Sequence, residues 1–349
     1  MTLPGMDIAA LRDYLVGAGI DVAGELRVEL ISGGRSNLTF KAYDDRTTWV
    51  VRRPPTSGLT PSAHDMAREY TVTSRLAETS VPVAAAVAFD ADGAALGAPM
   101  TVVEYVEGSV IRDRADLATL TDAQVEASAA ALVATLVDLH AVDYRAAGLE
   151  NFGRPHEFVA RQVALWARQW DRVKTRDLPD FAALHAALSE AIPATSDASI
   201  IHGDFRIDNT ILDSESPDIV RAVVDWEMST LGDPLTDIAL MCVYRTPVFD
   251  LVLGADAAWT SPRLPSPEVL AQRYATLSGR DLADWNFYLA LANFKLGVIG
   301  EGITHRALHG SDAGADARRA AEATPEFMAA GLRALRTVSR TGHRSTESL

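Results

Sequence analysis

Short runs of alternating apolar and polar positions fill most of the first hundred residues, which is the pattern of strands with one buried face. Two runs flank a Gly-Gly-Arg-Ser-Asn segment between Val28 and Asp44 and predict a hairpin. A third run, residues 47–53, stops at two prolines, and two more flank an Asp-Gly turn between Pro82 and Gly108. Residues 1–15 and the segment from Ser62 to Leu76 have the spacing of helices instead.

In the second part of the chain, apolar positions recur at helical spacing. We expect helices over Asp122–His140, Pro155–Lys174 and Ala182–Ala191. A short strand-rich stretch follows between Ser199 and Glu227, and helical spacing returns from Leu235 onwards.

These patterns predict an α+β protein with two lobes. A small strand-rich lobe takes residues 1–106, and a larger helical lobe takes residues 107–340. The polar end of the chain, residues 341–349, is expected to fray. Ligands favour the cleft between two such lobes, so the functional residues are expected there.

Composition narrows the function classes. The 349 residues include one cysteine, Cys242, which excludes an internal disulfide and a Cys-based zinc site. Lys and Arg number 32 against 47 Asp and Glu, so neither a nucleic-acid groove nor a nucleic-acid partner is expected. No apolar run reaches the ~18–20 residues of a membrane span, and the first residues lack the apolar segment of a signal peptide. We therefore expect a cytoplasmic protein with no membrane partner.

The most informative segment is His202–Asn209, with the sequence HGDFRIDN. Asp204 precedes Asn209 by five positions, and Asp225 follows at the end of another apolar run. Phosphoryl transfer needs one carboxylate to orient a hydroxyl, and a carboxylate and an amide oxygen to hold Mg²⁺. The spacing agrees with the kinase pattern H-R-D-x-x-x-x-N followed by a metal-binding acid, with Gly203 in place of the Arg. Turn-forming Asp and Asn residues are the alternative, but the combined motif favours the kinase pattern.

The segments HGDFRIDN, VVDWE and GDPLTDIA together resemble the aminoglycoside phosphotransferase family, the small-molecule branch of the protein-kinase-like fold. The segments SGGRSNLTF, VVRRPP, REY and DWEMSTLGDPLTDIA resemble a bacterial subgroup, similar to the phosphotransferase-like domain fused to acyl-CoA dehydrogenases. The resemblance covers about Ile31 to Leu308. It implies a two-lobed protein-kinase-like fold, ATP and Mg²⁺ as cofactors, and a nucleotide and a small-molecule acceptor as partners.

The resemblance also implies roles for the motif residues in the second lobe. Asp204 takes the position of the catalytic base, and Asn209 and Asp225 take those of the metal ligands. His202 is expected to brace the loop, and Trp226 to pack where kinases place the Phe of D-F-G.

Three further acids keep two interpretations each. Glu227 is expected to have a structural role, with contact to a second metal or to the substrate as the alternative. Asp233 and Asp237 are expected to hold the segment that follows them, or else to face the substrate.

In the first lobe, the resemblance implies a nucleotide site. The phosphate-covering loop corresponds to Ser32, Gly33, Gly34, Ser36 and Asn37.

Arg52 stands where kinases have the Lys of V-A-I-K, with Arg53 as the second choice and Glu69 as its expected partner. Backbone groups near Glu104 and Val106 are expected to bind the adenine edge.

We therefore expect an ATP- and Mg²⁺-dependent O-phosphotransferase. The excess of acids, larger in the second lobe, slightly favours a cationic acceptor such as an aminoglycoside. A hydroxyacyl-CoA is the alternative acceptor, favoured by the arginines and tryptophans of one helix, namely Arg161, Trp166, Arg168, Trp170 and Arg172. A nucleotide-binding pseudokinase is the alternative from another class.

For two other pairs of aromatic residues we expect structural roles and no ligand site. His305 and His309 lie four positions apart without a third ligand nearby, so we expect surface histidines and no zinc site. Trp166 and Trp170 are expected to pack in the core or between the lobes, with a roof over the acceptor pocket as the alternative. The chain has no G-x-S-x-G motif, so a hydrolase triad has no support.

Overall fold

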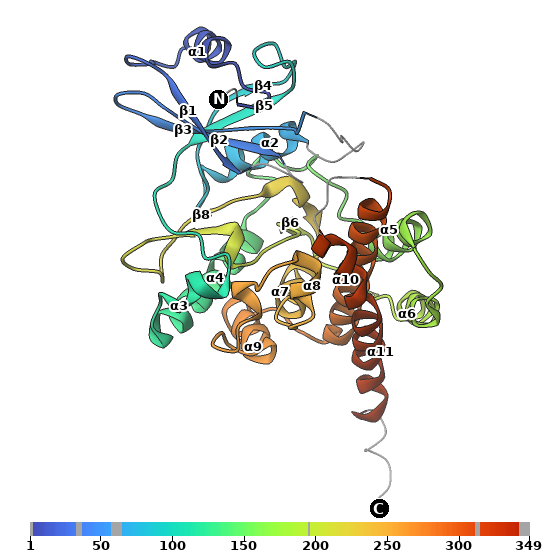
Figure 1. Cartoon of the computed structure of the whole chain (residues 1–349). Helices are drawn as coiled ribbons and strands as arrows, with labels where there is room; N and C mark the ends of the chain where they lie inside the picture. Colours follow the sequence, from blue (N-terminus) through green and yellow to red (C-terminus); the bar gives the residue numbers. More distant parts are fainter. Residues whose placement is uncertain (1–2, 33–36, 57–64, 195, 311–314, 342–349) are drawn as a thin grey trace, which may run out of the picture.

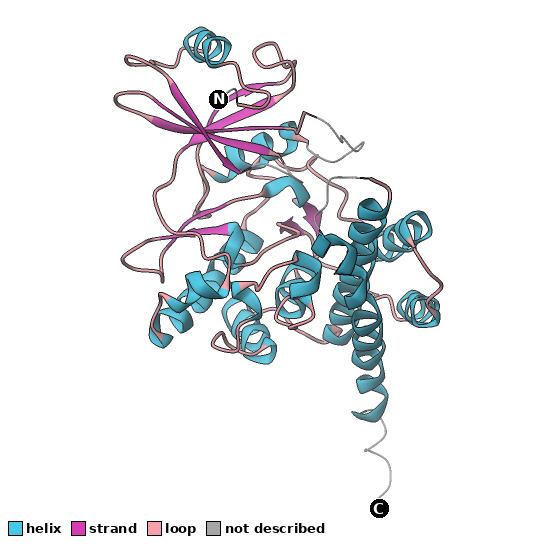
Figure 2. Ribbon diagram, viewed as in Figure 1, coloured by secondary structure: helices cyan, strands magenta, loops and turns pink. Residues whose placement is uncertain are grey.

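The computed structural model describes residues 3–32, 37–56, 65–194, 196–310 and 315–341. Strands dominate the first lobe and helices the second, as Figures 1 and 2 show. The predicted two-lobed α+β architecture is therefore confirmed. None of the helices in these ranges combines the length and the hydropathy that crossing a membrane requires.

A five-stranded antiparallel sheet forms the first lobe. One face of this sheet packs on helix α1 (Ile8–Gly17) and buries alternate side chains, among them Phe40, Val51 and Val102. Because side chains alternate along a strand, the residues between them, such as Arg52, lie on the face that lines a cavity toward the second lobe. The strands, in spatial order, are β1 (Arg27–Ser32), β2 (Leu38–Tyr43), β3 (Thr48–Arg53), β5 (Met100–Glu104) and β4 (Ala86–Asp90).

Helix α2 (Met66–Leu76) connects this sheet to the second lobe. Its amino end is capped by Asp65, whose carboxylate accepts the N–H of Arg68. Val72 and Leu76 enter the large core of the second lobe, while Glu69 faces the cavity. The expected start at Ser62 lies outside the described residues.

Helices enclose the large core of the second lobe, and four short strands lie at the side that faces the cleft (Figure 1). The strands pair as β6 with β9 and as β7 with β8. Their bounds are β6 (Ser199–Ile201), β7 (Thr210–Leu212), β8 (Val220–Val223) and β9 (Thr230–Gly232). The helices are α3 (Arg114–Ala118), α4 (Asp122–Ala141), α5 (Phe158–Val173), α6 (Pro179–Glu190), α7 (Leu235–Val243), α8 (Phe249–Leu253), α9 (Pro267–Ser278), α10 (Trp285–Leu308) and α11 (Thr324–Thr341).

Two helix starts differ from the expected ones for local reasons. Helix α5 begins at Phe158, because Glu157 before it has a left-handed backbone (φ 52°) that cannot continue a helix from Pro155. Helix α6 begins at Pro179, since proline suits the first turn, where its missing N–H would have no partner. Residues 342–349 of the polar end lie outside the described ranges, and the lobe boundaries stay predictions.

Candidate active site

Strand pairing brings the motif residues of the second lobe together. In the pair β7–β8, Thr210 lies opposite Val223, so Asn209 and Asp225 come from neighbouring strand ends. The N–H of Val224 donates to the carbonyl of Asn209 at 2.9 Å and closes this pairing. The loop of residues 202–209 therefore lies beside the turn that carries Asp225.

Asp204 lies at the centre of a polar network. Tyr244 donates to its Oδ1 at 2.5 Å, and Arg206 Nε donates to the same oxygen at 3.3 Å. Asn209 Nδ2 donates to Oδ2 at 3.1 Å and to the backbone carbonyl of Asp204 at 2.8 Å. Burial raises the pKa of Asp204, but the charge of Arg206 and the hydrogen bond from Tyr244 outweigh it, so the pKa is lowered. Asp204 is thus an ionised acceptor whose oxygens have fixed positions.

Asn209 and Asp225 offer oxygen atoms to a cation. The amide nitrogen of Asn209 is used by Asp204, which leaves its amide oxygen available. Asp225 has a left-handed backbone (φ 66°), a conformation that costs a residue other than glycine ~1–2 kcal/mol. Such strain is concentrated at functional sites. One carboxylate and one amide oxygen suit Mg²⁺, whose remaining positions water and phosphate oxygens can fill.

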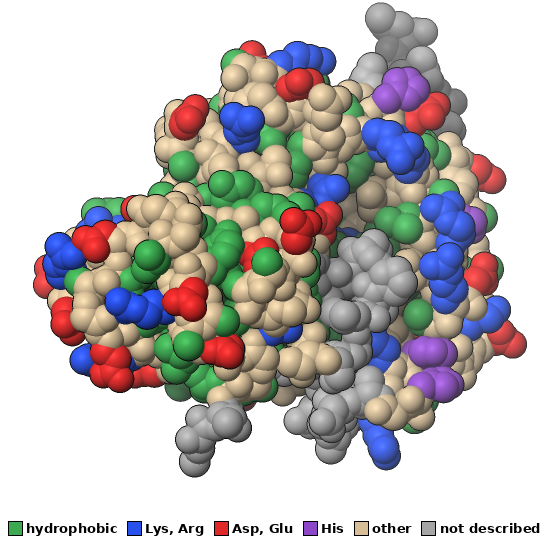
Figure 3. Space-filling model, turned by 90° about the horizontal axis from the view of Figure 1, so that it is seen from above, with side chains coloured by type: hydrophobic (Ala, Val, Ile, Leu, Met, Phe, Trp, Pro, Cys, Tyr) green, Lys and Arg blue, Asp and Glu red, His purple; other side chains and the backbone are tan. Residues whose placement is uncertain are grey.

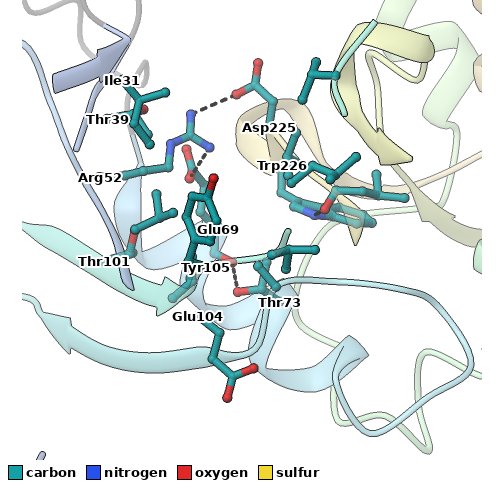
Figure 4. A pocket seen from close by; sticks show the side chains of 18 of the residues that line it. Ile31, Thr39, Arg52, Glu69, Thr73, Thr101, Glu104, Tyr105, Asp225 and Trp226 are labelled. Atoms are coloured by element: carbon teal, nitrogen blue, oxygen red, sulfur yellow. Dashed lines mark hydrogen bonds and ion pairs between the residues drawn. The ribbon is translucent and has the colours of Figure 1, made fainter. Parts of the chain in front are cut away.

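Arg52 lies between two carboxylates (Figure 4). Its guanidinium contacts Glu69 at 3.0 Å and Asp225 at 3.0 Å, and these side chains are 17%, 6% and 31% exposed, respectively. The Arg52 Nε–H is buried and has no hydrogen-bond partner among the described residues. Arg52 also lines the adjacent cavity, so its guanidinium offers positive charge to an anionic ligand there.

Arg53 lies on the opposite face of β3. It donates to the backbone carbonyls of Pro54, Gly5 and Leu96, and so ties the amino-terminal segment to the sheet. The alternation along β3 therefore puts Arg52, and not Arg53, at the cavity.

Asp237 fixes the 202–209 loop through hydrogen bonds to its backbone. Its carboxylate accepts the N–H groups of His202 at 2.6 Å and Gly203 at 2.8 Å. His202 Nε2 in turn contacts the carbonyl of Val224 at 2.9 Å and links the loop to the Asp225 turn. Gly203 has φ +84°, and a Cβ there would lie 2.8 Å from the carbonyl oxygen of Met228, so only glycine fits.

The two acids of the GDPLTD segment act differently. Asp233 accepts the N–H of Leu235 in the following segment, as one of the two interpretations expects, and also bonds Tyr288. Asp237 holds the preceding loop instead of the following segment, because the turn into α7 brings its carboxylate under residues 202 and 203.

A cavity of about 420 Å³ opens between the sheet and the second lobe. Its apolar walls include Val50, Val103 and Val223, and Arg52 and Asp225 line it too. At its edge, the N–H groups of Glu104 and Tyr105 already donate to backbone carbonyls, whereas that of Val106 has no hydrogen-bond partner among the described residues. The Glu104 side chain points away from the cavity (Figure 4), so Glu104 itself can meet an adenine edge only through its backbone.

Part of the expected phosphate-covering loop lies outside the described residues. Gly33, Gly34 and Ser36 lie outside the described residues, and Ser32 is described by its backbone alone. Asn37 is buried and donates to Glu69 at 3.0 Å. The loop's role toward phosphate stays a prediction.

Glu227 approaches the same site. Ligand atoms of Glu69, Asp225 and Glu227 lie within 4.8 Å of one another. Burial raises the pKa of Glu69 to about 7, and burial together with the nearby Asp225 raises that of Glu227 to about 7. Trp226 is buried against His202, which agrees with a packing role.

A second cavity, of about 330 Å³, lies on the other side of the 202–209 loop between α5 and α10. Its lining is mostly apolar and includes Trp166, Leu165 and Leu291, and it reaches Gly203 and Lys295. Trp170, four residues after Trp166, is buried instead and stacks on Phe181. One tryptophan therefore packs in the core, and the other lines a cavity.

Sequence reasoning missed three residues near Asp204: Arg206, Tyr244 and Lys295. Arg206 pairs with Asp204 and Asp208, and its position inside the HGDFRIDN motif was a signal that could have found it. Tyr244 and Lys295 come from the end of α7 and from α10, where no local pattern distinguishes them.

His305 and His309 stack on each other, and no cluster of potential metal ligands in the described ranges includes them.

A model of the phosphotransferase enzyme family (APH) matches residues 27–272. Acyl-CoA dehydrogenase family member 10 from Mus musculus is 33% identical over 92% of this chain, and family member 11 from Homo sapiens is 31% identical over 88%. The chain spans only 30% and 40% of the lengths of these two relatives.

Solved structures agree with this match. A putative aminoglycoside phosphotransferase from Ralstonia eutropha is 30% identical, with a TM-score of 0.82 over 95% of this chain and 98% of that chain. Aminoglycoside phosphotransferase APH(4)-Ia, solved with AMP-PNP and hygromycin B, is 16% identical, with a TM-score of 0.60 over 92% of this chain and 98% of that chain. The second likeness shows the fold alone.

The contacts of Arg52 and Arg53 give opposite expectations for their alanine variants. We expect Arg52→Ala to weaken ATP binding by about 10- to 100-fold, the worth of one or two charge-assisted hydrogen bonds, and adenosine binding much less. Arg52→Lys should restore part of the ATP affinity, since the charge is kept and the planar fork is lost. Calorimetric titration with ATP and with adenosine measures both.

Arg53→Ala is the matched control. It removes hydrogen bonds to three backbone carbonyls, so we expect a lower melting temperature and an ATP affinity within about twofold of the native value. Equal losses of ATP and adenosine affinity in Arg52→Ala would contradict phosphate contact by Arg52.

Proposed function

Because the chain belongs to the phosphotransferase enzyme family, and is thus a small-molecule kinase by class, we propose that it transfers the γ-phosphate of ATP to a hydroxyl group of an acyl acceptor. The observation that carries this proposal is that Asn209 contacts Asp204 and lies beside the turn of Asp225, which lines the nucleotide-sized cavity. A carboxylate for the hydroxyl and two oxygen ligands for a cation are the parts that phosphoryl transfer needs.

Asp204 orients the acceptor hydroxyl and takes its proton as the new oxygen–phosphorus bond forms and the bond between the γ-phosphorus and the β–γ bridging oxygen breaks, with ADP as the leaving group. The carboxylate is ionised and its oxygens are fixed by Tyr244, Arg206 and Asn209, so little reorganisation is needed when the acceptor binds. The residues that would hold Mg²⁺ are Asn209 and Asp225, and the ion would supply positive charge to the phosphates.

Arg52 supports an active enzyme over a pseudokinase. It makes the ion pair with Glu69 that a kinase lysine makes with the glutamate of its helix, and it lines the cavity in which phosphates would lie. The base, the amide ligand and the acidic ligand are all present as well. A pseudokinase needs none of them in this arrangement.

The second cavity favours an acyl acceptor over an aminoglycoside. Several ammonium groups need carboxylates around them, but the one carboxylate in the described lining, Asp237, is engaged by two backbone N–H groups. The remaining lining is apolar or uncharged apart from the cation Lys295. We therefore propose an acyl acceptor in place of the cationic acceptor that the charge of the whole lobe slightly favours.

The outer part of α5 is consistent with a hydroxyacyl-CoA. Arg161, Arg168 and Arg172 follow one another at helical spacing, on a face of α5 next to the one that carries Trp166 into the cavity. Arg168 and Arg172 are exposed, so phosphate groups outside the cavity could reach them. The relatives named acyl-CoA dehydrogenase family members also support an acyl thioester.

Asp204→Asn tests the base. The amide keeps the size of the side chain but cannot take the proton, so we expect turnover to fall by ~10²–10⁴. Mg·ATP affinity should stay within a few-fold, since Asp204 is not a proposed metal ligand. Single-turnover kinetics and calorimetry measure the two quantities, and unchanged turnover would contradict the assignment.

Asp225→Asn tests the metal ligand. We expect the Mg²⁺-dependent part of ATP binding to disappear, because an amide oxygen is a much weaker ligand than a carboxylate. Titrations of ATP with Mg²⁺ and with EDTA separate this part from the rest. Equal Mg·ATP affinity in the native and variant proteins would show that the cation is held elsewhere.

A panel of acceptors tests the substrate class. We expect phosphate transfer to medium-chain hydroxyacyl-CoA thioesters and none above background to kanamycin-like aminoglycosides, because the described cavity offers them no free carboxylate. Radiolabelled transfer from ATP is the measurement. Transfer to aminoglycosides alone would overturn the acyl assignment and leave the fold and the mechanism unchanged.

A further inference from the structure

Lys295 occupies an unusual position in the second cavity. It is one of three lysines in a chain whose Lys and Arg total 32, and it comes from the middle of α10. Its Nζ donates to the carbonyl of Gly203 at 2.8 Å and lies 5.8 Å from the centre of the Trp166 ring. A compact ammonium group with three rotatable donors therefore stands beside the residue that precedes Asp204.

The nearby carboxylates do not pair with this ammonium. Asp237 accepts two backbone N–H groups, and Asp204 accepts Tyr244, Arg206 and Asn209. Among the described residues, no carboxylate lies within ion-pair distance of Lys295, and its one hydrogen bond is to Gly203. Burial lowers the pKa of Lys295, against the opposite effect of Asp204 and Asp237. A cation in such a place is costly unless a ligand completes its contacts.

We propose that Lys295 is a specificity-determining residue that binds a carbonyl or carboxylate oxygen of the acceptor, close to the hydroxyl that receives the phosphate. The inference deepens the proposed function and rests on it. The apolar walls around Trp166 and Leu291 take the carbon chain, and the ammonium takes the oxygen. The acceptor class is then a hydroxy acid or its thioester, and a simple alcohol lacks the group that Lys295 recognises.

A bracing role for Lys295 predicts a different outcome. Through Gly203 alone, the lysine would stabilise the 202–209 loop, and its loss would affect all acceptors alike. Recognition of an acceptor oxygen affects only acceptors that carry this oxygen, and it acts mainly on KM. A matched set of acceptors therefore separates the two roles.

The experiment uses Lys295→Met, which keeps the apolar stem, and Lys295→Arg, which keeps the charge. Lys174→Met is the control, since Lys174 is half-exposed at the end of α5. The acceptors are medium-chain hydroxyacyl-CoA thioesters, the free hydroxy acids and the corresponding diols. We expect Lys295→Met to raise KM about 10-fold or more for the first two groups, with kcat within about threefold, and to raise it much less for the diols, whose hydroxyl replaces the carbonyl or carboxylate. Lys295→Arg should recover part of the loss, and Lys174→Met should behave as the native protein.

Equal losses for diols and acyl acceptors in Lys295→Met would overturn the proposal in favour of bracing. An unchanged KM for the acyl acceptors would overturn it as well. Calorimetric binding of a hydroxy acid in the presence of ADP provides a readout that needs no transfer. Binding that is lost in Lys295→Met would support the Lys295 site even if no phosphate moved, and would then contradict the proposed function alone. No binding to the native protein would overturn the Lys295 site.

Discussion

The charge balance around Arg52 is the constraint on which the site depends. Its guanidinium lies between Glu69 of α2 and Asp225 of the second lobe, both at 3.0 Å. Buried ions cost several kcal/mol each unless they are paired, and two neighbouring carboxylates repel unless a cation separates them. Strand β3, helix α2 and the end of β8 must therefore meet at this point, beside the cavity between the sheet and the second lobe. The position of the cavity follows from the pairing of three side chains.

The same arrangement links ligand binding to the contact between the lobes. Asp225 accepts a hydrogen bond from Arg52 through one carboxylate oxygen and is also the proposed ligand of a cation. A nucleotide and its cation would therefore compete with the ion pair, the phosphates for Arg52 and the cation for Asp225. A second connection between the lobes does not involve these charges. Arg68 of α2 donates to the carbonyls of Ser229 at 2.8 Å and Phe152 at 3.1 Å. The Arg52 contacts can therefore rearrange around phosphates while α2 stays attached to the second lobe.

Features that depend on residues close together in the sequence could be predicted, whereas contacts between residues far apart in the sequence could not. Alternation in β3 is local, so the strand and the choice of Arg52 as the residue at the cavity could be predicted from the sequence. The spacing of Asp204, Asn209 and Asp225 is also local, and β-pairing preserves it in space. Tyr244 and Lys295 reach the same loop from helices far along the chain, and no rule of periodicity indicates which helical residue points there. The expectation that Asp237 holds the segment after it was wrong for the same reason. Which residues its carboxylate meets depends on how α7 packs against the 202–209 loop.

The proposed acyl acceptor differs from the cationic acceptor that total charge favours, because total charge does not describe the lining of one cavity. The chain has 47 acidic against 32 basic residues, yet Figure 3 shows both kinds interspersed over the face seen from above. Exposed charges are screened over roughly 8–10 Å in physiological salt, so their excess acts on distant encounters more than on bound ligands. In the second cavity, the carboxylate of Asp237 accepts two backbone N–H groups, while Lys295 lines the cavity and has no carboxylate partner among the described residues. An acidic lobe thus contains a largely apolar cavity with one lysine that pairs with no described carboxylate, because folding decides which charges are paired and which remain available to a ligand.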